Sequence, residues 1–482
     1  MNNDIKNIEP KEIWSNFAKL NSIPRPSKKE DKVREFMVNF GKNLGLETVV
    51  DPVGNVIIKK PASKGMENRK TVVLQGHLDM VCQKNNETDF DFDTQGIQMY
   101  VDGDWVKAKG TTLGADNGLG VSAIMAILES KDIAHPPIEA LFTIDEETGM
   151  TGAIGLQAGY LDGEILLNLD TEDDDEIGVG CAGGIDITGT KTYKTQAVSN
   201  TAKAFKITVK GLQGGHSGMD IHKGFGNANK LMNRILYAVQ NEILIAEIKG
   251  GSLRNAIPRE SNAIVVTEDF GAMNENFTKI ANDIKEEYAT IEKDLEIRLT
   301  EVTKPKNAIS KEAQYTFIRV VYGIPNGVFR MSPDIEDLVE TSNNLARITM
   351  ENGAIEIACL TRSSIESGKM DLAYQIQSIF ELGDFNVELS GSYPGWKPNP
   401  NSEIVKLLEN IYKDKFNEEP KILACHAGLE CGILGTNYPE MDMVSFGPNI
   451  RGAHSPDEKA SISSTKKFWN YLLDVLKNIP KK

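Results

Sequence analysis

The chain has 482 residues, 40% of them hydrophobic and 25% charged, with a formal net charge of −16. This length predicts two or three domains, and the negative charge argues against a nucleic acid partner. No stretch is apolar enough to span a membrane, the first residues lack the layout of a secretory signal, and the five cysteines form no Cys-x-x-Cys pair. We therefore expect a cytoplasmic protein without a disulfide framework or a thiolate zinc site.

The N-terminal region is predicted to form two amphipathic helices within residues 8–46. Ser27 and Glu30, three residues apart, have the spacing of a capping box that opens the second helix. Strands are expected at about 47–60 and 71–75.

His77 and Asp79 directly follow the second of these strands. Residues two apart on an extended strand point the same way, so both side chains are expected together at the strand end. A carboxylate commonly holds the second ring nitrogen of a metal-bound imidazole. Taken alone, the His-x-Asp spacing also fits a chance surface pair.

A glycine-rich segment from Gly114 to Gly120 precedes a buried helix expected at 121–128. It places Asp116 at the start of the helix, where an aspartate is most often an N-cap or turn residue. The segment lacks the Gly-Lys-Ser/Thr ending of a phosphate-binding loop.

Two further apolar strands, at 138–144 and 165–169, also end in acidic residues. The first is followed by Glu146 and Glu147, whose side chains should point apart, so that one can hold a metal while the other faces a bound water. A solvated loop is the alternative reading. The second strand is followed by Asp170. Carboxylates and imidazoles that converge at one sheet edge form the ligand set of a divalent ion.

From about residue 187 the pattern changes to alternating strands and helices, with His216 in a glycine-rich turn. The elements after about residue 310 look like a degenerate second copy of those before, and 391–398 has the composition of a linker. We predict that an inserted α+β domain of two related units, residues 187–391, separates two parts of a first domain, residues 1–186 and 392–482. In the second part, His454 lies in a Gly/Ser/Pro loop without an apolar face, which favours a ligand role.

Together these segments resemble the M20 metallopeptidases, from about residue 10 to the end of the chain. The matching motifs, in family order, are Gly76–Asp79, Gly114–Gly118, Asp145–Gly149, Leu169–Asp170, Gly214–Gly218 and Gly452–Ser455. Within the family, residues 81–85, 425–432 and 449–454 are most similar to the bacterial aminoacyl-histidine dipeptidases.

This resemblance implies an α/β fold. It implies a zinc-exopeptidase-like catalytic domain, with a mixed, largely parallel sheet between helices, and an inserted α+β sandwich that acts as a lid. It also implies two zinc ions per chain, for which Mn²⁺ or Co²⁺ can substitute.

The family pattern assigns a role to each candidate residue. His77 and Asp170 would hold one metal, Glu147 and His454 the other, and Asp116 would bridge both. Asp79 would orient His77, and Glu146 would be the general base. His216, Asn255 and Arg362 of the lid would lie near the substrate, with His216 acting on the oxyanion. Glu430 is a candidate for binding the substrate amine, and a structural loop acid is equally compatible with its position.

We therefore expect an exopeptidase that hydrolyses dipeptides, including Xaa-His dipeptides such as β-alanyl-histidine. An N-acyl amino acid deacylase or another M20-type aminopeptidase is the alternative, and a deacylase would need no acid near a substrate amine. A non-catalytic metal-stabilised binding protein is a third reading, against which Glu146 argues, because a structural site needs no base. The expected partner is a short peptide, and the chain is expected to be a monomer or a homodimer.

Overall fold

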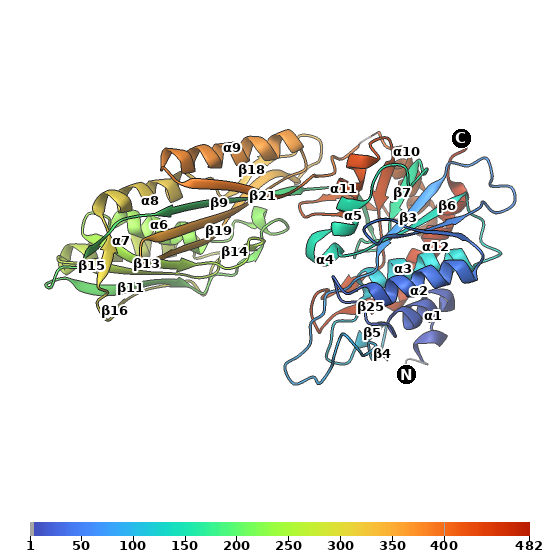
Figure 1. Cartoon of the computed structure of the whole chain (residues 1–482), viewed down its shortest axis with the longest axis horizontal. Helices are drawn as coiled ribbons and strands as arrows, with labels where there is room; N and C mark the ends of the chain where they lie inside the picture. Colours follow the sequence, from blue (N-terminus) through green and yellow to red (C-terminus); the bar gives the residue numbers. More distant parts are fainter. Residues whose placement is uncertain (1–3, 400) are drawn as a thin grey trace. The chain divides into compact units, whose positions relative to one another are not determined.

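The computed structural model describes residues 4–399 and 401–482, which form two compact units (Figure 1). Unit 1 contains the chain up to Gly180, then Trp396–Ala424 and Leu429–Lys482. Unit 2 contains Cys181–Gly395 and the short segment Cys425–Gly428. The sequence analysis set the boundaries at 186/187 and 391/392, and it assigned the 425–428 segment to the first domain.

Unit 1 is built on an eight-stranded mixed sheet in the order β1-β2-β6-β3-β7-β23-β8-β22. The strands are β1 (Glu47–Val50), β2 (Val56–Lys60), β3 (Val72–His77), β6 (Ile138–Thr143), β7 (Ile165–Asn168), β8 (Glu176–Cys181), β22 (Lys421–Cys425) and β23 (Asp442–Ser445). The central strands β6, β3, β7 and β23 are parallel. Every residue of β3, β6 and β7 is buried, as their continuous apolar runs predict for strands covered on both faces.

Helices surround this sheet. They are η1 (Ile5–Asn7), α1 (Lys11–Leu20), α2 (Asp31–Asn43), α3 (Ala115–Glu129), α4 (Glu146–Gly149), α5 (Thr151–Gly155), α10 (Glu403–Phe416), α11 (Glu430–Asn437) and α12 (Ile462–Asn478). Helix α3 is buried on all sides from Asn117 to Leu128, as its uniformly apolar sequence requires. A small second sheet, in the order β24-β25-β5-β4, pairs Ile450–Arg451, Lys459–Ser461, Trp105–Ala108 and Met99–Asp102.

The predicted capping box at the start of α2 is wrong. Glu30 is the N-cap residue, but no side chain caps the helix. The Ser27 hydroxyl instead donates to Asp79 Oδ2 at 2.8 Å, and Glu30 Oε1 accepts the backbone N–H of Asp145 at 3.1 Å. Both side chains are drawn into contacts with the loops that follow β3 and β6, which local spacing does not reveal.

Unit 2 has a nine-stranded sheet in the order β16-β11-β15-β13-β19-β20-β9-β21, with β18 paired to β19. The strands are β9 (Gly183–Thr192), β11 (Lys203–Lys210), β13 (Ile243–Gly250), β15 (Ser261–Thr267), β16 (Glu296–Glu301), β18 (Gly327–Met331), β19 (Val339–Glu351), β20 (Ala354–Ser363) and β21 (Asn386–Tyr393). The helices α6 (Ala228–Ala238), α7 (Phe270–Tyr288), α8 (Lys311–Gly323) and α9 (Glu366–Leu382) pack on it through one continuous apolar core. Two short pairs complete the unit: β10 (Thr195–Ala197) with β17 (Asn307–Ile309), and β12 (Gly215–His216) with β14 (Ala256–Ile257).

The nine-stranded sheet contains two halves of the same topology. The first half runs β11-α6-β13-β15-α7-β16, and the second runs β9, then α8-β19-β20-α9-β21. The strands occupy equivalent places in the two halves, and antiparallel pairing of β13 with β19 joins them. The first strand of the second half, β9, precedes the entire first half in sequence. The sequence pattern identified the repeat after residue 310 but not this first strand.

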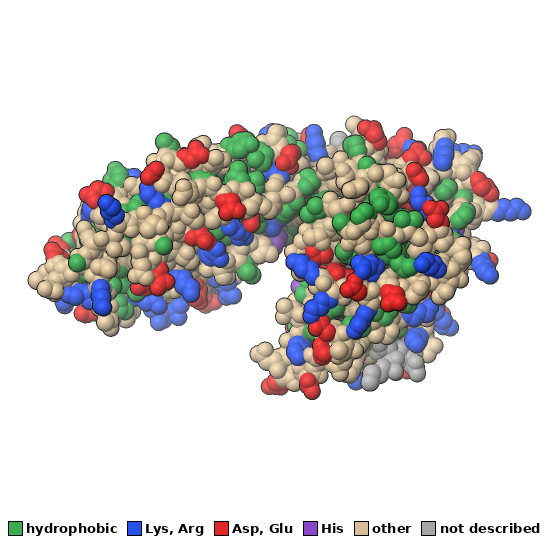
Figure 2. Space-filling view, viewed as in Figure 1, with side chains coloured by type: hydrophobic (Ala, Val, Ile, Leu, Met, Phe, Trp, Pro, Cys, Tyr) green, Lys and Arg blue, Asp and Glu red, His purple; other side chains and the backbone are tan. Residues whose placement is uncertain are grey.

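Charged side chains of both signs are interspersed over the visible face of each unit (Figure 2). Among the described residues, no helix combines the length and the apolar composition needed to cross a membrane.

Candidate metal centre and active site

Seven predicted site residues come together in unit 1, where the parallel central strands end. His77 is the last residue of β3 and Asp79 follows it, Glu146 and Glu147 open α4 after β6, and Asp170 follows β7. Asp116 lies in the first turn of α3, and His454 lies in the loop between β24 and β25. Because the parallel strands lie side by side, their carboxyl ends deliver these side chains to one edge of the sheet.

Asp116 is shared by two groups of possible metal ligands. Its Oδ1 lies 3.1 Å from His77 Nε2, which is also 3.5 Å from Asp170 Oδ1. Its Oδ2 lies 3.2 Å from His454 Nε2, which is also 3.0 Å from Glu147 Oε2. Within each group the ligand atoms lie within 4.8 Å of one another. One carboxylate with an oxygen in each group is the arrangement that a bridged pair of ions needs.

The electrostatics of the cluster are those of a site built for cations. Hydrogen bonds to Asp116 and Glu147 raise the pKa of His454 to about 11. Burial opposes a charge on His77, yet Asp170 and the other nearby carboxylates raise its pKa well above the ordinary value. Burial raises the pKa of Asp170 to about 6. The buried carboxylates thus favour positive charge at this site.

Two buried carboxylate oxygens of the cluster lack a hydrogen bond. Glu147 Oε1 has no hydrogen-bond partner, and Asp170 Oδ1 has only the 3.5 Å contact with His77 Nε2. A buried carboxylate oxygen without a partner is costly, and a divalent ion satisfies it. Two histidines and three carboxylates are also ligands that Zn²⁺ accepts. The residues present therefore fit two metal ions that share Asp116.

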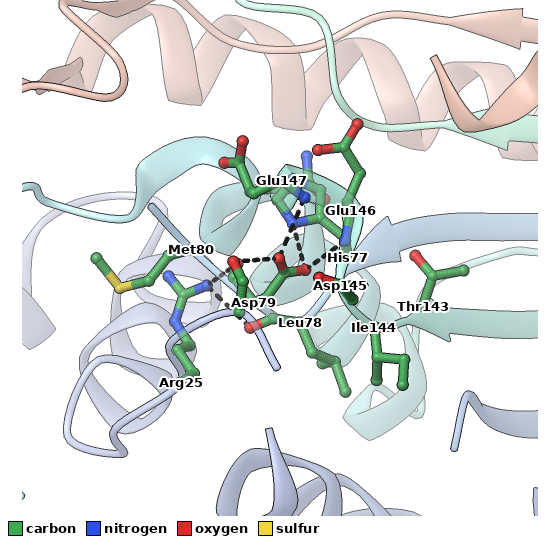
Figure 3. Close-up of polar contacts among 12 residues, drawn as sticks. Arg25, His77, Leu78, Asp79, Met80, Thr143, Ile144, Asp145, Glu146 and Glu147 are labelled. Atoms are coloured by element: carbon green, nitrogen blue, oxygen red, sulfur yellow. Dashed lines mark hydrogen bonds and ion pairs between the residues drawn. The ribbon is translucent and has the colours of Figure 1, made fainter. Parts of the chain in front are cut away.

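Asp79 is fully buried and fixes the orientation of His77 (Figure 3). Its Oδ1 lies 3.3 Å from His77 Nδ1, and its two oxygens accept the backbone N–H groups of Glu146 at 3.0 Å and Glu147 at 3.2 Å. Burial disfavours its charge, but the contacts with His77, Ser27 and the Glu146 N–H together outweigh burial and lower the pKa of Asp79 to about 2. Asp79 therefore leaves His77 Nε2 to face the metal site. Ser27, which the sequence analysis did not assign to the site, completes its hydrogen bonds.

Glu146 differs from Glu147 in its surroundings. It belongs to a ligand-type group with His77 and Glu147, but it does not pair with either histidine. Burial raises its pKa well above the ordinary value, and the charges of Asp170, Glu430 and Glu147 add to this rise. A carboxyl group with a raised pKa beside a metal centre has the properties of a proton-transfer group.

His216 belongs to unit 2, where strand β12 pairs with β14. Its Nδ1 accepts the backbone N–H groups of Gly218 at 3.3 Å and Met219 at 3.1 Å. The ring proton must then lie on Nε2, which becomes a donor. Burial, together with the charge of Arg362, lowers the pKa of His216 to about 4, so the ring is neutral at pH 7.

The other two predicted lid residues lie in the same part of unit 2. The carbonyl of Asn255 accepts the N–H of Ser217 at 2.8 Å, and its side chain is exposed. Arg362 is buried, and its Nε and Nη1 donate to Ser217 Oγ at 3.4 Å and Tyr393 Oη at 2.8 Å. Tyr393 was predicted to lie in a linker, but β21 extends to it. The strand continues because Tyr393 still pairs with Gly184 of β9.

Glu430 lies in unit 1 at the first position of α11 and is 1% exposed. Its Oε2 accepts hydrogen bonds from Gln75 Nε2 at 2.6 Å and Thr143 Oγ1 at 2.7 Å. Burial raises its pKa to about 8. Glu430 therefore links β3 and β6, close enough to His77 and Asp170 for their charges to affect its pKa. Sequence reasoning did not anticipate this contact.

Comparisons with known proteins bear on the family and the fold of the chain. The model of Peptidase family M20/M25/M40 matches residues 73–478. The cytosol non-specific dipeptidase of Escherichia coli (strain K12) is 46% identical over 99% of this chain and 100% of its own length. The crystal structure of aminoacylhistidine dipeptidase from Vibrio alginolyticus matches with a TM-score of 0.92 and 47% identity, over 99% of this chain and 98% of that one. Aminopeptidase PepT from Bacillus cereus shares the fold, with a TM-score of 0.58 and 15% identity over 98% of this chain and 99% of its own.

Proposed function

The chain belongs to peptidase family M20/M25/M40, and from this we propose that it is a cytoplasmic dipeptidase that works with two zinc ions. The observation that carries the proposal is Asp116, whose two carboxylate oxygens face different histidines in two adjoining ligand groups. The names of the two relatives that are 46% and 47% identical, both dipeptidases, support the substrate class. The word cytosol in one of these names supports the compartment.

In this proposal His77 and Asp170 would hold one metal ion, Glu147 and His454 would hold the other, and Asp116 would be a ligand of both. When bound, such ions supply the Lewis acidity that acidifies water and polarises a peptide carbonyl at neutral pH.

The remaining steps belong to side chains of the chain. Glu146 takes the proton of the attacking water and returns it to the leaving amine, a role that its raised pKa favours. Neutral His216 donates from Nε2 to the developing oxyanion. Arg362 binds the free carboxylate of the dipeptide.

Substrate length separates this proposal from its alternative. Hydrolysis rates should be measured with zinc or manganese on β-alanyl-histidine, other Xaa-His and unrelated dipeptides, a tripeptide, and N-acetyl amino acids. We expect cleavage of the dipeptides and strongly reduced rates when either terminus is blocked or extended. Comparable rates on N-acetyl amino acids would instead identify a deacylase. They would also remove the reason for an amine site at Glu430, which stays a prediction.

A further inference from the structure

A buried arginine connects two segments that carry proposed metal ligands. Arg25 is 1% exposed. Its Nη1 donates to the carbonyls of Leu78 at 3.1 Å and Asp79 at 2.8 Å, directly after β3, as Figure 3 shows. Its Nη2 donates to the carbonyl of Gly114 at 2.5 Å, in the turn before α3. Burying a guanidinium costs several kcal/mol. A buried arginine therefore needs acceptors that match the geometry of its N–H groups, and the three carbonyls provide them.

A buried carboxylate accepts hydrogen bonds from the backbone N–H groups of the same turn. Glu458 is 2% exposed. Its Oε2 accepts from Leu113 at 2.7 Å and Gly114 at 2.9 Å, and its Oε1 accepts from Ala115 at 2.7 Å and Asp116 at 3.4 Å. Helix α3 has Gly114 as its N-cap residue and therefore no capping side chain of its own. Glu458, more than 340 residues later in the chain, is instead the acceptor for the N–H groups of this turn.

The two side chains leave the turn little freedom. Gly114 donates its N–H to Glu458 and offers its carbonyl to Arg25. Its φ is +69°, a conformation that suits glycine, and a Cβ there would approach Arg25 Nη2 to 2.5 Å and Met80 Sδ to 2.8 Å. The backbone that carries Asp116 is thus fixed from both sides.

We propose that Arg25 and Glu458 are positioning residues of the metal centre, which hold the turn of the bridging Asp116 at a fixed distance from the His77–Asp79 segment. The inference rests on the proposed two-metal site. Asp116 must present one oxygen to each ligand group, so a small shift of its backbone weakens both groups at once. Substitution of residues that hold metal ligands in place typically weakens metal affinity by ~10–100-fold.

Two variants remove these contacts while keeping the size of the side chain. In Glu458→Gln, the amide places an NH₂ group against N–H donors, so two of the four hydrogen bonds are lost. In Arg25→Lys, the positive charge remains, but one ammonium cannot reproduce the planar fork that spans three carbonyls. We expect each variant to bind zinc ~10–100-fold more weakly than the wild type. Competition with a fluorescent chelator measures the zinc dissociation constant, and metal analysis after desalting measures the zinc content.

A matched control separates positioning from general stability. Lys369 of unit 2 is also fully buried, and its Nζ donates to Ser392 Oγ at 3.1 Å and the carbonyl of Tyr393 at 2.8 Å. Lys369→Met should lower the melting temperature of the metal-free protein and leave the zinc dissociation constant unchanged.

The double variant gives a second check. Both side chains act on Gly114. The fold-loss of zinc affinity in the double variant should therefore be smaller than the product of the fold-losses in the two single variants.

Unchanged zinc affinity in Glu458→Gln and Arg25→Lys, with a lower melting temperature, would overturn the inference and leave the two residues as ordinary parts of the fold. If Glu458→Gln does not fold, Glu458→Asp, which keeps the charge on a shorter side chain, is judged by the same zinc criterion. A wild-type protein that binds no zinc would overturn the proposed function itself, a result distinct from unchanged affinity in the variants.

Discussion

Replacing His216 with alanine tests whether unit 2 takes part in the chemistry. Two backbone N–H groups occupy Nδ1 of this histidine, which leaves Nε2 as its donor. Loss of one donor to an oxyanion typically lowers kcat by ~10²–10³-fold, or about 2.7–4 kcal/mol of transition-state stabilisation. We expect a loss of this size in His216→Ala, with the zinc content unchanged because no proposed metal ligand is altered.

The pKa of His216 adds a second expectation. An ordinary histidine, with a pKa near 6.5, would be mostly protonated at pH 5.5. The pKa of His216 is lowered to about 4 by burial and by Arg362, so the ring stays neutral down to about pH 5. The acid limb of the rate profile between pH 5 and 7 therefore belongs to other groups. The His216→Ala profile should keep the shape of the wild-type profile at a lower level.

Steady-state kinetics on one dipeptide, from pH 5 to 8, provide the measurement. His222, an exposed histidine in the short 3-10 helix Ile221–Lys223, offers a matched control, and His222→Ala should keep the wild-type kcat. Near-normal turnover by His216→Ala would refute the donor role. Loss of the acid limb in His216→Ala would refute the assignment of a neutral ring.

Two further substitutions address the carboxylates. Glu146→Gln should lower kcat by ~10²-fold or more while both metals remain, because the amide cannot accept a proton. Glu147→Gln should release zinc, and the reverse pattern in metal analysis would exchange the two roles. Glu430→Gln removes a carboxyl whose pKa burial raises from 4.5 to about 8. Between these values the unfolded chain releases a proton that the folded chain keeps, so the wild type should lose up to ~1.4 kcal/mol per pH unit relative to the variant as pH rises. Thermal unfolding of both metal-free proteins at pH 5 and pH 8 measures this difference, and a parallel pH dependence would show that Glu430 is ionised in the fold.

The sequence predicted those features that depend on local pattern. Continuous apolar runs marked β3, β6 and β7, and the polar residues after each run marked His77, Asp170 and the Glu146–Glu147 pair. The predicted family, α/β fold class and metal-dependent hydrolase class are confirmed by the family match and by the TM-score of 0.92. The role of each individual site residue stays a prediction.

Features that depend on contacts between distant segments could not be predicted. Glu458 accepts the N–H groups of the turn that carries Asp116, although it lies near the other end of the chain. Ser27 donates to Asp79 instead of capping α2. The burial of Glu430 against Gln75 and Thr143 follows from how α11 packs on the sheet, which its sequence does not encode locally. Strand β9 is the first strand of the second half of the nine-stranded sheet, and the next element of that half, α8, begins more than 100 residues later.

The zinc content of the protein tests the central claim, two metals that share Asp116, most directly. The zinc-loaded protein should retain about two equivalents per chain after desalting, and a chelator should abolish dipeptide hydrolysis. Asp116→Asn, which weakens the shared ligand, should lower the retained zinc at both positions together. A wild-type content of zero, activity that survives the chelator, or an Asp116→Asn protein that still holds two zinc ions would contradict the account.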